Sequence, residues 1–555
     1  MSASSKKKLR KEQNAAALTE KQLAAQKESK KLKAYTTTFT VLIVLVVVAA
    51  LAVAGFTAFM NSGILQRNTN ALTIGDVTLT NADLNFFYMD NIQNDHNNWH
   101  NSYGDNTQLF VQWMMGLNIG LPLDDQMYDE ASGKTFADYY TDMAINSAKE
   151  VYAIYNLAVA AGETLTEAQK NELETAMQSM ELYAAMYGYS SSVDYLKAMY
   201  GPGTTLDGYR NYLTVKTVAT NYAKKVYADL EVTDAEIADR NNNSYDEFSE
   251  FDYSVFFVDV NDFLPCNSQE TAEGHVHSDE EKAVAQKAAL EAAKALVASG
   301  ANTTELLNAA IAASDAYKDN TDAKATDRFG YSLSQVSEEQ GIWLKSEARK
   351  IGDLEMIAKK TTTKDTEGKE TTIDGYQIML YLGRDDNEQN LVSVRHILVK
   401  FTGGTTDANG NTTYSPKEKE TALAAIEAIK AEWLANGGTE EAFIALAKEK
   451  STDDGSKANG GLYEDIYPGQ MVTNFNDWCF AEEREPGNYE IVETEYGYHL
   501  LYFVAKQENT YRQLMIEDAL RDEKYTNWYN EQQEAATVTV LDTKYLTRDY
   551  VIENH

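Results

Sequence analysis

One stretch of this chain occurs twice, and the repeat limits the possible folds more than any other feature of the sequence. Residues 375–382 read GYQIMLYL and residues 497–504 read GYHLLYFV, so the apolar positions are kept while Gln377 is replaced by His499. In both cases the stretch closes a series with the order strand, long loop, two helices, loop, short helix and two strands. Self-similarity of this kind predicts two copies of one α+β module in tandem, rather than a solenoid.

The remaining sequence places a helical domain before the modules and a short tail after them. Stretches rich in Met and Tyr at helical spacing fill residues 68–245, ahead of a first module at 250–387 and a second at 391–507. The Met and Tyr side chains indicate an ordinary core, with an adaptable groove for unfolded chains as the alternative. The tail at 508–555 predicts a helix and a lone strand. A lone strand needs a partner, and the hairpin TIGDVTLT near the start of the helical domain is the obvious candidate.

The N-terminus predicts a membrane anchor. The run from Val41 to Phe59 carries no charge and is long enough to cross a bilayer as a helix, which we place at 35–62. The segment before it holds ten Lys/Arg against three Glu, so the positive-inside rule puts residues 1–34 in the cytoplasm and the rest outside. A cleaved signal peptide is the alternative, because AVAG at Ala52–Gly55 loosely matches a cleavage site.

Charge and cysteine content narrow the class of protein. The chain has 555 residues and a net charge of −36, which argues against binding nucleic acid. Cys266 and Cys479 are the two cysteines, so there is no disulfide framework. His275 and His277 lie in the acidic stretch EGHVHSDEE and could bind zinc, but a solvated loop is the simpler interpretation. These features favour an extracytoplasmic protein of a bacterium, of the Gram-positive type.

The second module carries a set of motifs that resembles the parvulin-type peptidyl-prolyl isomerases. The motifs are VRHILVK, STDDGSKANGGL, PGQMV, TNFNDW and TEYGYHLLYF. One departure is GGLYED, which has Leu462 where the family usually has an acidic residue after the second glycine. The resemblance implies catalytic roles for His396, Asp453 and His499, and substrate-binding roles for Leu462, Met471, Phe475 and Thr494.

This assignment fits the chemistry of the reaction. Rotation about an X–Pro bond loses amide resonance against a barrier of about 18–20 kcal/mol, and no bond is broken. Neither metal nor cofactor is therefore expected, whereas an apolar cup for the proline ring and polar groups that favour the twisted amide are required. Members of the family that read phosphate carry a basic cluster after the first strand, whereas the loop here has lysines only at its ends, so the resemblance implies non-phosphorylated substrates.

The first module lacks this set. In our alignment of the two modules, Ser254 corresponds to His396 and Gln377 corresponds to His499. The motif STDDGSKANGG has no clear counterpart there. We therefore expect a degenerate module without isomerase activity, which acts as a scaffold or as a surface that holds clients.

The whole predicted arrangement resembles the PrsA and SurA class of foldases: α+β and multidomain, with an N-terminal transmembrane helix, a chaperone-like helical domain and two parvulin-like modules. The resemblance implies a single-pass membrane protein that isomerises X–Pro bonds and assists the folding of unfolded or nascent secreted proteins. A non-catalytic holdase and a cell-surface scaffold are the alternatives. The oligomeric state and the clients do not follow from the sequence.

Overall fold

The computed structural model describes residues 3–13, 42–56, 58–59, 62–265, 277–364, 369–407 and 410–552. By its internal contacts the chain divides into two units, one of Met1–Leu230 with Lys524–His555 and one of Glu231–Glu523. The predicted membrane segment at 35–62 lies partly outside the described residues, and residues 42–56 are helical. Within the described ranges, no helix combines the length and the apolar character that a membrane span requires.

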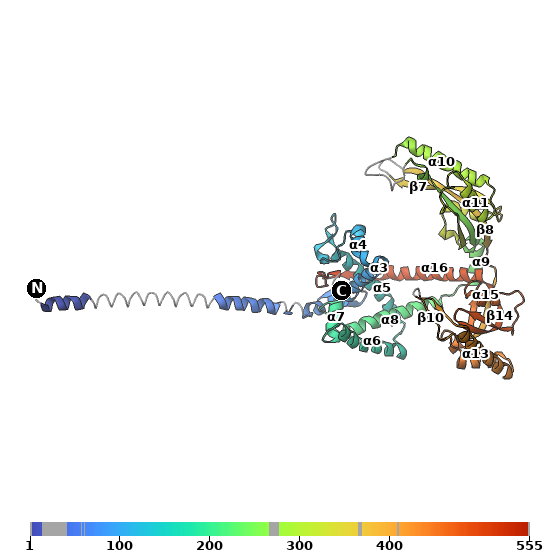
Figure 1. Cartoon of the computed structure of the whole chain (residues 1–555). Coiled ribbons are helices and arrows are strands. Elements are labelled where there is room, and N and C mark those ends of the chain that lie inside the picture. The colour runs from blue at the N-terminus through green and yellow to red at the C-terminus, as the bar shows by residue number, and fades with distance from the viewer. Residues whose placement is uncertain are drawn as a thin grey trace. The chain divides into compact units, whose positions relative to one another are not determined.

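Helices dominate the first unit (Figure 1). They enclose a core of aromatic and aliphatic side chains. Several of them begin at a threonine that caps the helix and pairs with an acidic or amide side chain three residues later, as Thr80 does with Asp83 and Thr135 with Asp138. The helices are α2 (Ile64–Asn68), α3 (Asn81–Tyr103), α4 (Thr107–Met115), α5 (Phe136–Ala160), α6 (Glu167–Met186), α7 (Ser192–Tyr200) and α8 (Leu206–Asp229). The strands are β1 (Asn70–Ile74), β2 (Val77–Thr80), β3 (Met127–Asp129), β4 (Lys134–Thr135) and β15 (Val538–Val540).

The C-terminal tail completes the first unit. Strand β15 pairs antiparallel with β1 of the N-terminal hairpin, in the sheet order β15-β1-β2. The residues after it are held by buried amides: Asn81 donates to the Asp542 carbonyl at 2.7 Å, and the Thr547 amide donates to Asn85 at 2.8 Å. Leu546, Tyr550 and Ile552 then enter the same core as the helices.

The first module of the second unit is a four-stranded sheet in the order β6-β5-β8-β7, and α10 packs against it (Figure 1). Helix α9 (Asp234–Asn243) precedes it and belongs to the second unit, although the sequence placed it in the helical domain. The strands are β5 (Glu250–Asp259), β6 (Thr326–Tyr331), β7 (Leu354–Lys364) and β8 (Lys369–Asp385). The helices are α10 (Asp279–Ala298), α11 (Thr304–Ala313) and α12 (Glu338–Leu344).

The second module repeats this plan, with the sheet order β12-β9-β14-β13. Its strands are β9 (Asn390–Lys400), β12 (Leu462–Ile466), β13 (Tyr489–Thr494) and β14 (Gly497–Thr510), with the short pair β10 (Thr405–Thr406) and β11 (Thr412–Thr413). Its helices are α13 (Pro416–Ala435), α14 (Glu440–Lys450) and α15 (Thr473–Cys479), and α16 (Tyr511–Ala535) follows. One sheet face packs against α13 and α14 and the other against α15.

A matching Trp–Arg pair occurs at the same place in the two modules. In the first, the Arg349 guanidinium lies 4.3 Å from the centre of a Trp343 ring, and its Nε donates to the Trp343 carbonyl. In the second, Arg484 lies 4.2 Å from Trp478 and makes the same hydrogen bond. Such a pair anchors the short helix to the turn that follows it.

The strand register corrects one of the matches drawn from the sequence. His396 pairs with Leu501 on β14, and the residue that corresponds to Leu501 on β8 is Met379, whose partner is Val255. Val255, and not Ser254, therefore stands at the place of His396. A one-residue shift exchanges the two faces of a strand, so an alignment that is wrong by one residue points to the wrong side of the sheet.

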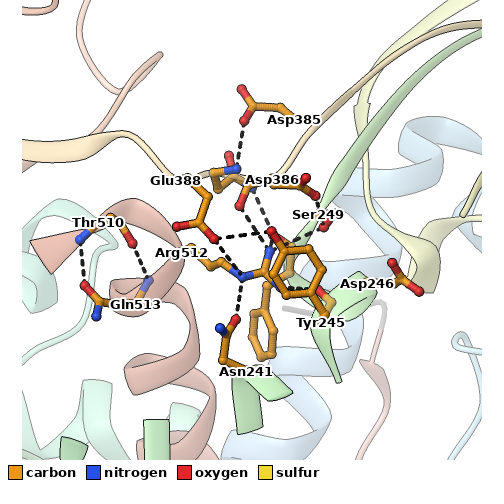
Figure 2. Close-up of polar contacts among 12 residues, drawn as sticks. Asn241, Tyr245, Asp246, Ser249, Asp385, Asp386, Glu388, Thr510, Arg512 and Gln513 are labelled. Atoms are coloured by element: carbon orange, nitrogen blue, oxygen red, sulfur yellow. Dashed lines mark hydrogen bonds and ion pairs between the residues drawn. The ribbon is translucent and has the colours of Figure 1, made fainter. Parts of the chain in front are cut away.

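A single buried arginine joins the segments that border both modules (Figure 2). Arg512 on α16 is 1% exposed, and its Nη1 donates to the carbonyls of Phe248 and Asp386 at 3.3 and 3.0 Å. Its Nε donates to Asn241 at 2.6 Å, and its guanidinium stacks 3.6 Å from the centre of the Tyr245 ring. The segment before the first module and the segment after it therefore both contact the Arg512 side chain at the start of α16.

Candidate isomerase site

Two histidines meet on the face of the second sheet that packs against α15. His396 on β9 and His499 on β14 lie diagonally across the antiparallel pair, because His396 is paired with Leu501 and His499 with Leu398. Residues two apart on a strand share a face, so both imidazoles point the same way. Their Nδ1 atoms are 3.1 Å apart, and the rings are nearly parallel at 18°.

The loop after α14 brings Asp453 to this pair. The Thr452 amide donates to the Leu398 carbonyl at 2.9 Å, and the His396 amide donates to the Gly461 carbonyl at 2.8 Å, so both ends of the loop are held against β9. Gly461 has a φ of +75°, and a Cβ there would lie 2.1 Å from the His396 carbonyl oxygen. Only glycine fits this approach.

Asp453 is held through one oxygen. Its Oδ2 lies 3.0 Å from His396 Nε2 and accepts from the Ser456 amide and hydroxyl at 3.0 and 2.5 Å. Tyr463 donates to the same oxygen at 3.2 Å. On the other side of the pair, Thr494 Oγ1 lies 2.8 Å from His499 Nε2. A continuous row of polar groups thus runs from Thr494 through the two imidazoles to the carboxylate.

Burial and charge set the protonation state of this row. Burial lowers the pKa of His396, against the opposing effect of Asp453, and burial together with His396 lowers the pKa of His499 to about 3. Burial alone would raise the pKa of Asp453, but the Ser456 hydrogen bond and the His396 ring outweigh it and lower that pKa to about 2. At neutral pH the site therefore holds two neutral imidazoles and one carboxylate.

The hydrogen bonds then fix which nitrogen carries each proton. An ionised carboxylate can only accept, so His396 Nε2–H donates to Asp453 and His396 Nδ1 is an acceptor. His499 Nδ1–H donates to that acceptor, which leaves His499 Nε2 to accept from the Thr494 hydroxyl. Each donor in the row therefore points toward the carboxylate.

An apolar cavity of about 380 Å³ opens beside the row. Of the residues assigned from the sequence, His396, Asp453, His499, Met471 and Phe475 line it, and Phe475 is buried with its ring against both imidazoles. The remaining lining residues are Leu398, Lys400, Tyr463, Gln470, Val472 and Tyr496.

Two assigned residues lie elsewhere. Leu462 does not line the cavity, because it is paired with Arg395 and so shares the face that Arg395 occupies, whereas the next residue, Tyr463, is paired with Val394 and faces the cavity. Thr494 is 8% exposed and lies behind His499, where it supports the imidazole.

Sequence reasoning missed Ser456 and Tyr463. Ser456 stands three residues after Asp453 in STDDGSKANGG, and a serine or threonine three residues from an aspartate is a recurrent hydrogen-bonding pair in tight loops, so spacing alone could have found it. Tyr463 carries no such signal, because its role depends on the register of β12.

The other features singled out in the sequence form no second site within the part of the chain that the structure describes. Cys479 is free and buried, and burial raises the pKa of its thiol to about 12. Cys266 and His275 lie outside the described residues. Across the ranges that the structure describes, no cluster of His, Cys, Asp or Glu is arranged to hold a metal ion.

Comparison with known proteins identifies the class of the domain that holds this site. Residues 376–507 match the family of PPIC-type PPIASE domains. Foldase protein PrsA 1 of Listeria monocytogenes serotype 4b (strain F2365) is 36% identical over 111 residues, which cover 19% of this chain and 38% of the relative. Chaperone SurA of Chromohalobacter salexigens is 32% identical over 148 residues, which cover 25% of this chain and 28% of the relative.

The chain therefore carries a parvulin-type peptidyl-prolyl isomerase domain similar to those of PrsA and SurA, which confirms the resemblance drawn from its motifs. It spans well under two thirds of the length of these relatives. The solved structure of PrsA from Bacillus subtilis aligns with 73% of this chain and 89% of its own at 14% identity, with a TM-score of 0.26. A score this low says nothing of a shared overall arrangement.

Proposed function

We propose that the chain is an extracytoplasmic peptidyl-prolyl isomerase and chaperone that assists the folding of secreted proteins. The observation that carries the proposal is the polar row of Thr494, His499, His396 and Asp453 beside an apolar cavity in the parvulin-type domain. The similarity to PrsA and SurA over this domain supports it.

The geometry suits rotation about an X–Pro bond. Met471, Val472 and Phe475 offer an apolar wall for the proline ring. In the planar amide the carbonyl oxygen carries more negative charge than in the twisted one, so a carboxylate nearby disfavours the planar form and lowers the barrier. Asp453 provides that charge, and the neutral imidazoles hold the carboxylate without cancelling it.

The N-terminal segment supports a membrane anchor in the same proposal. The charge-free run from Val41 to Phe59 follows a basic segment, which places the helical unit and both modules outside the cytoplasm. Mass spectrometry of the N-terminus in the membrane fraction distinguishes a retained anchor from a cleaved signal peptide: an intact N-terminus supports the anchor, and a new N-terminus near Gly55 contradicts it.

The function is tested by refolding an unrelated protein whose slow step is proline isomerisation. We expect the full chain to accelerate this step, and Asp453→Ala and His499→Ala to reduce the acceleration at least about tenfold, because each removes a hydrogen bond to a charged or buried partner worth ~1.5–3 kcal/mol. Gln377→Ala, at the place of His499 in the first module, is the matched control and should change nothing.

The same variants separate catalysis from holding. A chaperone that works through the helical unit alone would suppress aggregation of an unfolded client equally well with Asp453→Ala. Equal acceleration by wild type and Asp453→Ala would contradict the assigned site, and no acceleration by the wild type would contradict the enzymatic function.

A further inference from the structure

Tyr463 is one of the residues that line the cavity. It is paired with Val394, and Leu462 before it is paired with Arg395. Successive residues of a strand point to opposite faces, so Tyr463 shares the face of His396, two residues beyond Val394 on β9. The strand therefore delivers a phenol, and not the preceding leucine, to the site.

The backbone of β12 is shaped to keep this orientation. Pairing passes from Val394 to Val392 on β9 while β12 advances from Tyr463 to Ile466, so β12 carries one extra residue in a bulge. Asp465 in this bulge has a φ of +54°, a left-handed conformation that costs energy for a residue other than glycine. The bulge lets Ile466 enter the core behind α15 while Tyr463, three residues earlier, lies on the same face.

The phenol reaches the carboxylate end of the polar row. Its hydroxyl donates to Asp453 Oδ2 at 3.2 Å, and its ring lies 5.1 Å from the His396 ring. The same oxygen also accepts hydrogen bonds from His396 Nε2 and from the amide and the hydroxyl of Ser456. Within the described part of the chain, no side chain or amide donates to Oδ1 of Asp453. The carboxylate is thus held through Oδ2, and Oδ1 keeps its capacity to meet a substrate.

The protonation states of Tyr463 and Asp453 maintain the hydrogen bond between them. Burial, followed by the charge of Asp453, raises the pKa of Tyr463, so the phenol keeps its proton at any physiological pH. The Asp453 carboxylate accepts only, and the phenol beside it donates. No rearrangement of protons is needed to keep the hydrogen bond.

We propose that Tyr463 is a positioning residue for Asp453, which holds the carboxylate by Oδ2 so that Oδ1 is presented to the X–Pro amide. The proposal rests on the proposed isomerase function. The ring of Tyr463 forms part of the cavity wall, whereas its hydroxyl acts through Asp453, so the two contributions can be separated by removing the hydroxyl alone.

The test is Tyr463→Phe in the full chain, assayed on an X–Pro peptide. We expect kcat to fall about tenfold, as for the loss of one hydrogen bond to a charged group, with KM and the urea midpoint of unfolding unchanged. In an Asp453→Ala background the same substitution should have no further effect, because the residue acts through the carboxylate. Tyr467→Phe, four residues further on, is the matched control, since Tyr467 stacks on Tyr511 and does not line the cavity.

A second measurement does not depend on activity. Carbon-13 NMR of aspartate-labelled protein follows the Asp453 carboxyl, and loss of a donor should raise its pKa in Tyr463→Phe but not in Tyr467→Phe. An unchanged titration, or effects of Tyr463→Phe and Asp453→Ala on kcat that simply add, would overturn the proposal. An inactive wild type with a shifted titration would instead overturn the isomerase function and leave the hydrogen bond established.

Discussion

The two modules of the second unit have the same sheet order and the same Trp–Arg pair, yet they differ at the face turned toward the short helix. Where the second has His396 and His499, the first has Val255 and Gln377. The apolar positions that face the long helices are kept in both, as in Ile378 and Leu500. One side of the sheet thus maintains the fold, and the other side is free to carry or to lose a site.

The first module fills the corresponding space with other contacts. Gln340 stands at the place of Phe475, three residues before the tryptophan, and its side chain contacts the Met379 sulfur at 3.7 Å. Trp343 Nε1 donates to Glu355 at 2.8 Å. The space is therefore used for packing and hydrogen bonds, which fits a module without the chemistry.

The largest expected effect comes from replacing His396 of the second module with valine, the residue type at the corresponding place in the first module. His396→Val removes the donor to Asp453 and the acceptor for His499 at once, so we expect isomerase activity to fall about a hundredfold, or ~3 kcal/mol in activation free energy. The refolding assay measures it. Val255→His in the first module is the reciprocal control, and isomerase activity there, measured in the His396→Val chain, would show that one imidazole suffices.

The contacts that link the segments bordering the two modules can be tested by substituting Arg512. Arg512→Met leaves the carbonyl of Asp386 without its donor and removes one of two donors to the buried carbonyl of Phe248, which Asn387 also contacts, so we expect a loss of about 2–3 kcal/mol in the free energy of unfolding. Urea unfolding followed by tryptophan fluorescence measures this loss. Arg521→Met on the same helix removes only partly exposed pairs, with Glu517 and Asp518, and should cost under about 1 kcal/mol. Equal losses for the two variants would show that the buried contacts of Arg512 contribute no more to the free energy of unfolding than the partly exposed contacts of Arg521.

Acidification should weaken the second module more than the first. The pKa of His499 is about 3 in the folded chain and near 6.5 when unfolded, so between these values the unfolded chain binds more protons. Stability therefore falls as the pH drops below 6.5, on the order of 2 kcal/mol at pH 5. Asp453 acts in the same direction, but only below its unfolded pKa of 3.8.

His499→Gln, which installs the residue of the first module, isolates this contribution. Its urea midpoint should depend less on pH between 7 and 5 than that of the wild type. An identical pH dependence in the two chains would show that His499 is protonated in the folded state without penalty.

The smallest effect concerns the matched tryptophans. Trp343 donates to Glu355, whereas Trp478 Nε1 is buried and has no hydrogen-bond partner among the described residues. Trp343→Phe should therefore cost about 1 kcal/mol more than Trp478→Phe, since the loss of ring volume is common to both. Urea unfolding of the two variants measures the difference, and a larger loss at Trp478 would contradict it.

The sequence predicted the parts of this molecule that depend on local pattern. The repeat was sufficient for the two modules, and the lone strand for its return to the N-terminal hairpin, whereas His396, Asp453 and His499 as neighbours came from the resemblance to the parvulin family. Register was not predictable in this way, because it depends on which strands pair and where a bulge falls. The match of Ser254 with His396 and the choice of Leu462 over Tyr463 are both shifts of one residue, and each exchanges the face of a strand.

The tail that closes the first unit sets an order for biosynthesis. Leu546, Tyr550 and Ile552 belong to the core of that unit, and β15 completes its sheet, yet in the chain they follow both modules and are therefore made after them. Both modules are fully synthesised before the helical unit has all of its sequence. A chain emerging from its N-terminus thus finishes its middle first, and the helical unit cannot complete its core until the segment from β15 to Ile552 has been made.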